Sequence, residues 1–87
     1  MGRIVSSESC DAAAELLGGY ERIDCSLDPI WEAINRNPEG FEKIEADEFC
    51  ARYVITKPIC DLPALIWIFT IMGNGDIIFE HVEVFRE

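Results

Sequence analysis

The segment from Ala64 to Phe85, "ALIWIFTIMGNGDIIFEHVEVF", decides the fold, because it contains two apolar runs separated by Asn74-Gly75. This pattern predicts a β-hairpin, since a two-residue type I′ turn needs positive φ at both central positions and Asn-Gly tolerates it. A turn at this position also fixes the register of the two strands. The expected cross-strand pairs are Gly73–Asp76, Met72–Ile77, Ile68–His81 and Ala64–Phe85.

The expected register divides the side chains of the hairpin between two faces. The first face, expected beneath the helices, comprises Leu65, Trp67, Phe69 and Ile71 with Ile78, Glu80, Val82 and Val84. The second face mixes apolar and polar side chains and comprises Ala64, Ile66, Ile68, Thr70 and Met72 with Ile77, Phe79, His81, Glu83 and Phe85. Because two short helices cover only one side of a small sheet, we expect the second face to be open or partly shielded.

A strand and a helix are expected at the start of the chain. Arg3 to Val5 predicts a short opening strand, and "CDAAAELLGG" predicts a helix that ends at Gly18-Gly19. The helix is expected to pack on the sheet, because its apolar residues recur at helical spacing.

A second helix is predicted within "YERIDCSLDPIWEAINRNPEG". Ser26 or Asp28 is the expected cap, Pro29 suits the first turn, and Asn37-Pro38 marks the end. Trp31 belongs to the apolar stripe of this helix and is expected to anchor the core, with a ligand platform as the alternative.

The rest of the chain completes one α+β domain over residues 1–87. The segment "GFEKIEADE" is expected to be a polar connector, "FCARYVIT" a strand and "KPICDLP" a loop. We therefore expect a short N-terminal strand and two helices packed on one face of an antiparallel sheet of three to four strands. A chain of 87 residues has room for one compact core.

Charge and hydropathy limit the classes of partner. Seventeen acidic and seven basic residues give a formal net charge of -10, which repels phosphate backbones, so direct nucleic-acid binding is not expected. The apolar run "ALIWIFTIM" is about half the length that crosses a bilayer, and "MGRIVSSESC" lacks the apolar core of a signal peptide. These features predict a cytosolic protein that does not engage membranes.

The residues that carry chemistry form no recognisable motif. Cys10, Cys25, Cys50 and Cys60 contain no C-x-x-C pair, which favours reduced thiols over the alternatives of disulfides or a metal site. His81 is the only histidine, so a catalytic dyad would have to join it to Cys50 or Cys60. His81 and Glu83 are too few ligands for a metal. Glycine-rich phosphate-binding motifs are absent from the sequence, and no cofactor is expected.

The order of strand, two helices and three-stranded antiparallel run resembles the RelE/ParE superfamily of bacterial toxins. The resemblance covers Leu27 to Glu87, where "NPEGFEKIEADEFCARYVITKP" leads into "ALIWIFTIMGNGDIIFEHVEVFRE". It implies a concave sheet face that grips messenger RNA on the ribosome or contacts gyrase, and an antitoxin segment that covers this face. The nucleases of the superfamily need several basic residues there.

The matching stretches of this chain are poor in such basic residues. They offer Arg52, Lys57 and Arg86. With His81 as acid or base, Arg52 and Arg86 are the weak catalytic candidates, and the sparse set predicts that ribosomal nuclease activity is missing.

Two functions remain open from the sequence. The first is a RelE/ParE-like toxin or toxin-derived protein that binds a protein partner through the second face. This partner would be an antitoxin-like segment, a cellular target or a second copy of the chain. The expected contact residues are Ile68, Phe79, His81, Glu83 and Phe85. The second function is a small acidic inhibitor or nucleic-acid mimic of phage or mobile-element type. A second face buried as plain core under a loop is the remaining alternative.

Overall fold

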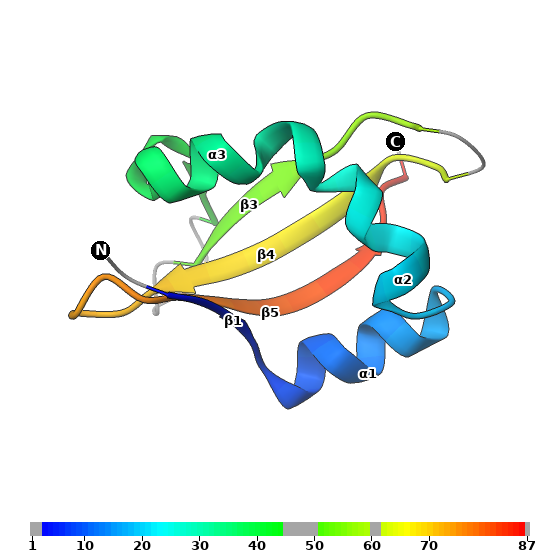
Figure 1. The fold of residues 1–87 in the computed structure, drawn as a ribbon, viewed down its shortest axis with the longest axis horizontal. Coiled ribbons are helices and arrows are strands. Elements are labelled where there is room, and N and C mark those ends of the chain that lie inside the picture. The colour runs from blue at the N-terminus through cyan, green and yellow to red at the C-terminus, as the bar shows by residue number, and fades with distance from the viewer. Residues whose placement is uncertain (1–2, 45–50, 60–61, 87) are drawn as a thin grey trace.

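The structure is a computed structural model that describes residues 3–44, 51–59 and 62–86 (Figure 1). Its helices are α1 (Glu8–Leu16), α2 (Tyr20–Ile23) and α3 (Asp28–Arg36), with 3-10 turns at Asp24–Ser26 and Pro38–Gly40. Its strands are β1 (Ile4–Ser6), β2 (Glu42–Lys43), β3 (Arg52–Ile55), β4 (Leu65–Ile71) and β5 (Ile77–Val84).

The strands form one mixed sheet in the order β1-β5-β4-β3-β2. The pairs β2–β3, β3–β4 and β4–β5 are antiparallel, whereas β1 runs parallel to β5. The α+β class is therefore confirmed, but the sheet has five strands and is not purely antiparallel. The additional strand, β2, is a polar segment of two residues and carries no alternating pattern that sequence reasoning could detect.

The two predicted helices form, and a third short one lies between them. The Ser7 hydroxyl oxygen accepts a hydrogen bond from the Cys10 N–H at 3.2 Å and caps α1. Beyond the end of α1, Gly18 and Gly19 adopt φ values of +102° and +87°, which favour glycine. The cap of α3 was expected at Ser26 or Asp28, but Leu27 occupies it. A 3-10 turn leads directly into α3, and the buried Ser26 hydroxyl donates to the Ile23 carbonyl instead.

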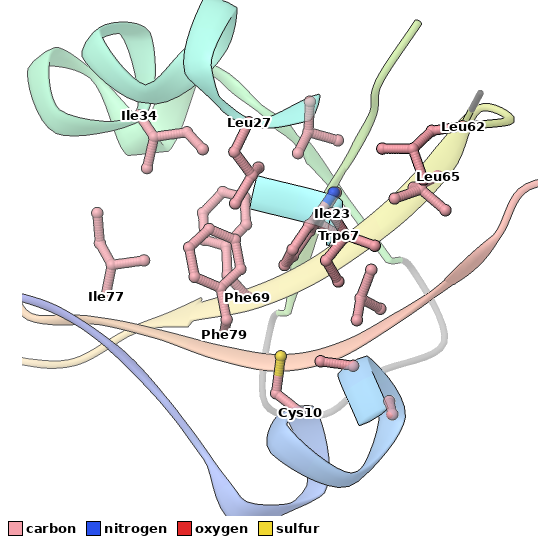
Figure 2. Packing of buried hydrophobic residues seen from close by; sticks show 14 residues of the cluster. Cys10, Ile23, Leu27, Ile34, Leu62, Leu65, Trp67, Phe69, Ile77 and Phe79 are labelled. Carbon is pink, nitrogen blue, oxygen red and sulfur yellow. The ribbon is translucent and has the colours of Figure 1, made fainter. Parts of the chain in front are cut away.

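The core lies between the helices and one face of the sheet (Figure 2). The helices contribute Cys10, Ala13, Ala14, Ile23, Leu27 and Ile34, and the sheet contributes Val54, Leu65, Trp67, Phe69, Ile77, Phe79 and Val82. Edge-to-face aromatic contacts join the Trp67 and Phe79 rings at 5.5 Å and the Phe69 and Phe79 rings at 5.8 Å. This face of the hairpin is thus the buried one.

The register of the hairpin is as expected in the half distant from the turn and differs near the turn. Ile68 pairs with His81 as predicted, but Phe69 pairs with Phe79, so that Glu80 is an extra residue in β5. Such an extra residue forms a β-bulge, and it moves the β5 side chains between the bulge and the turn to the opposite face from the one predicted.

The turn explains the shift, because it is longer by one residue than a type I′ turn. The Met72 N–H donates to the Asp76 carbonyl at 2.8 Å, and the Gly75 N–H donates to the Met72 carbonyl at 2.9 Å, which leaves Gly73, Asn74 and Gly75 as the loop. Gly75 has a φ of +92°. The Asn74 side chain accepts from the Asp76 N–H at 3.0 Å and favours this form of the loop.

The shift corrects the predicted faces. Ile77 and Phe79, expected on the second face, are buried in the core at 4% exposure each. Ile78 and Glu80, expected beneath the helices, lie on the other face, where the Thr70 hydroxyl donates to the Glu80 carboxylate at 3.3 Å. The loop shifts the register by one residue, and the bulge shifts it back by one residue. In the half of the hairpin distant from the turn, the side chains therefore keep the predicted faces.

We expect Gly75→Ala to lower the free energy of unfolding by about 1–3 kcal/mol, because a Cβ disfavours positive φ. Gly73→Ala is the matched control: its φ is not positive, and no atom lies within 4 Å of the added Cβ. Urea denaturation of both variants gives the measurement. Equal stability of the two would mean that the turn is not restricted at Gly75.

Candidate functional site

The sheet face that points away from the core forms the candidate binding surface, here called the open face. Ile68 pairs with Tyr53 and His81, and Ile66 pairs with Ile55 and Glu83, so these side chains share one side of the sheet. Val5, Thr70, Ile78 and Glu80 extend the same surface toward β1. All of these side chains are half-buried or exposed, and Val5 and Ile55 reach 44% and 40% exposure. Among the described residues, no helix covers this face. The sequence predicted that the second face of the hairpin would be open or partly shielded in this way.

The charged groups of the open face are acidic. Glu80 and Glu83 come from β5, and Glu42 pairs with Tyr53 at the opposite edge. The basic residues of the strands, Lys43 and Arg52, are in register with Phe69 and therefore belong to the core-facing side. The open face is thus an apolar surface with carboxylates and one imidazole.

The structure brings together most of the predicted contact residues. Ile68, His81 and Glu83 lie on the open face, and the His81 Nε2 is 3.6 Å from a Glu83 carboxylate oxygen. Phe85 follows β5, is half-buried, and its N–H donates to the Ala64 carbonyl at 2.9 Å. Phe79 does not belong to this surface, because the bulge turns it into the core.

The weak catalytic candidates do not converge. The Arg52 guanidinium donates to the backbone carbonyls of Glu39 at 2.9 Å and Phe41 at 2.7 Å, on the opposite side of the sheet from His81. Arg86 is exposed beyond the end of β5. Arg52 therefore fastens the connector after α3, and its charge is not available at the open face.

Two of the four cysteines, Cys10 and Cys25, lie within the described residues. Cys10 and Cys25 are free, and burial raises the pKa of the Cys10 thiol, which disfavours the reactive thiolate. Cys50 and Cys60, with which His81 would form a dyad, lie outside the described residues. Within residues 3–44, 51–59 and 62–86, no three His, Cys, Asp or Glu side chains gather as metal ligands. None of the helices in these ranges has the length and apolar character needed to cross a membrane.

A pocket on the helix side of the sheet is the feature that the sequence reasoning missed. It measures about 240 Å³ and is lined by Ile4, Val5, Ser6, Tyr20, Asp24, Leu27, Trp31, Trp67 and Phe79. An adjoining pocket of about 310 Å³ is lined by Asp24, Leu27, Asp28 and Trp31. Trp31 is 43% exposed, so the expectation that it anchors the core is wrong.

The sequence does carry a signal for this pocket. Asp24, Leu27, Asp28 and Trp31 follow the i, i+3, i+4, i+7 spacing of one helical face. Burial, and then the neighbouring charge of Asp28, raise the pKa of the Asp24 carboxyl. The pocket therefore combines an exposed indole with two solvent-exposed carboxylates, of which Asp24 has a raised pKa.

Arg52→Met should lower the free energy of unfolding by about 1–3 kcal/mol, because the Glu39 and Phe41 carbonyls lose a charged donor while the aliphatic part is kept. The control is Arg86→Met at an exposed position, for which a change within about 0.5 kcal/mol is expected. Denaturant titration compares the two. If Arg52→Met were as stable as Arg86→Met, the guanidinium would not be structural.

Comparisons with known proteins yield no relative. No family model, curated protein sequence or solved structure matches the chain. The resemblance to the RelE/ParE superfamily accordingly rests on the order of the elements and on the residues quoted from the sequence.

Proposed function

We propose that this chain is a small cytosolic binding protein of RelE/ParE type, a toxin or toxin-derived component of a toxin–antitoxin system, that docks a segment of a partner protein on the open face. The observation that carries the proposal is the uncovered apolar surface around Ile66 and Ile68, with carboxylates beside it. Both isoleucines are half-buried, and a contiguous apolar surface that no helix covers is typical of protein interaction sites.

The charges of the open face select the kind of partner. Glu42, Glu80 and Glu83 favour a segment with apolar residues at its centre and lysine or arginine at its margins. A second copy of the chain is a poorer occupant, because each copy has a formal net charge of -10 and brings the same carboxylates into the interface. Ile68, at the centre of β4, is the expected apolar anchor.

The same charges argue against nuclease chemistry on this face. Scission of a phosphodiester needs cations at the developing charge of the phosphate. The strands direct Lys43 and Arg52 to the other side of the sheet, and Arg52 is occupied by two backbone carbonyls. The positions of Lys43 and Arg52 support a binding role without ribosomal nuclease activity.

The order of the elements supports the link to the RelE/ParE superfamily. A short strand, helices and then the antiparallel run β3–β4–β5 follow each other along the chain. In that superfamily the sheet face is the working surface, and we assign the same role to the open face of this chain.

Ile68→Glu should leave folding nearly intact and weaken partner binding by more than ~2 kcal/mol, roughly 30-fold in Kd, by burying an unpaired carboxylate in the interface. Leu16→Glu, at an 88% exposed position of α1, is the matched control. The probe is the protein encoded by an adjacent small gene, co-expressed and titrated by calorimetry. Undiminished affinity of Ile68→Glu, with wild-type affinity for Leu16→Glu, would remove the open face from the interface.

The same titration separates the alternative of an acidic inhibitor or nucleic-acid mimic. Such a protein would act through its carboxylates, so its affinity would fall steeply with salt and would respond little to Ile68→Glu. If the partner binds through the open face, the affinity should respond strongly to Ile68→Glu and only weakly to salt.

We also expect no cleavage of messenger RNA by this chain, either free or with translating ribosomes, because no cationic cluster lies on the described open face. Primer extension on ribosome-bound message is the measurement. Cleavage that disappears in Arg86→Ala would contradict the prediction and show that sparse cations suffice.

A further inference from the structure

We propose that the pocket between β1, α2 and α3 binds a small organic ammonium cation, with Asp24 and Asp28 facing its charge and Trp31 contacting its alkyl groups. This site lies on the helix side of the sheet and shares only Val5, in the edge strand β1, with the open face. The residues shared by the two adjoining pockets, Asp24, Leu27 and Trp31, form its centre.

The walls of the pocket combine apolar and anionic surface. Leu27, Trp67 and Phe79 belong to the hydrophobic core, and Ile4 packs against it, so the inner wall is apolar and fixed by packing. Trp31 stands at the mouth with 43% of its surface exposed, which is unusual for a large aromatic side chain without a partner. An ammonium group over an indole face is attracted by the ring electrons.

The two carboxylates lack a compensating cation among the described residues. Neither Asp24 nor Asp28 takes part in a salt bridge there, and the charge that acts on Asp24 is the like charge of Asp28. Asp24 is a solvent-exposed residue, and partial burial of its carboxyl group also disfavours the ionised form. A bound cation would offset the repulsion between the two carboxylates.

The chemistry of the lining favours an organic cation over a metal ion. Calcium and magnesium take six or more oxygen ligands, whereas two carboxylates beside an indole and leucine offer few oxygens and much apolar surface. A volume of about 240 Å³ suits a short alkylammonium group.

The test uses choline as the probe and 3,3-dimethylbutan-1-ol, its uncharged carbon analogue, as the matched control ligand. The chain has two tryptophans, so the two indole N–H resonances in a nitrogen-15 correlation spectrum report on the exposed Trp31 and the buried Trp67 separately. Choline should shift the Trp31 resonance in a saturable manner, and the alcohol should not. Equal shifts with both ligands, or none with either, would overturn the proposal.

Two variants connect the binding to the carboxylate. Asp24→Asn should weaken choline binding about fivefold, because the ammonium group loses one of two solvent-exposed carboxylate partners. It should at the same time raise the melting temperature at neutral pH: the folded-state pKa of Asp24 is raised, so its ionised form opposes folding there. Glu15→Gln removes one charge from an exposed position of α1 and should change neither quantity. Unchanged choline affinity in Asp24→Asn would overturn the proposal.

A second ligand separates the sources of the ammonium group. Nα-acetyl-lysine amide carries a primary ammonium on a four-carbon chain and represents a lysine side chain of another protein. A lower Kd for choline assigns the site to a free quaternary compound. A lower Kd for the lysine derivative assigns it to a lysine side chain of a partner protein. Both outcomes require the loss of binding in Asp24→Asn.

Discussion

The packing of Phe79 against Trp67 and Phe69 is the constraint on which the arrangement of the sheet depends. These three rings make edge-to-face contacts and occupy the centre of the buried face. Phe79 reaches this position only because β5 contains the additional residue Glu80, which reverses the sides of the preceding residues. The same reversal moves Ile78 outward, so one bulge enlarges both the core and the apolar part of the open face.

The sequence predicted the elements with strong local signals. The helix ended by paired glycines, the helix with Pro29 in its first turn and the hairpin around Asn74-Gly75 all form. The bulge was not predictable, because an Asn-Gly pair suits both two-residue and three-residue loops and the choice depends on tertiary packing of Phe79. The parallel pairing of β1 with β5 depends equally on distant residues: the Arg3 N–H donates to the Asp76 carboxylate.

The candidate sites differ in how far the sequence revealed them. Alternation along β4 and β5 was enough to place Ile68, His81 and Glu83 on one surface, since the predicted register holds in that half of the hairpin. Trp31 was wrongly predicted to anchor the core, because an apolar stripe on a helix does not show which of its residues are buried. Ile34 is the buried residue of α3, whereas Trp31 is 43% exposed.

The pairing of the first strand with the last has a consequence for the way the chain acquires its fold. Arg3 and Asp76 are 73 positions apart, so the contact that fixes β1 beside β5 closes nearly the whole chain into a loop. Until it closes, the edge of an apolar hairpin presents unpaired N–H and carbonyl groups to other molecules. In the folded protein β1 covers one part of this edge and α1 follows along β5, where the Ser7 N–H donates to the Phe79 carbonyl. Protection of this edge against aggregation therefore depends on a contact between residues that are 73 positions apart.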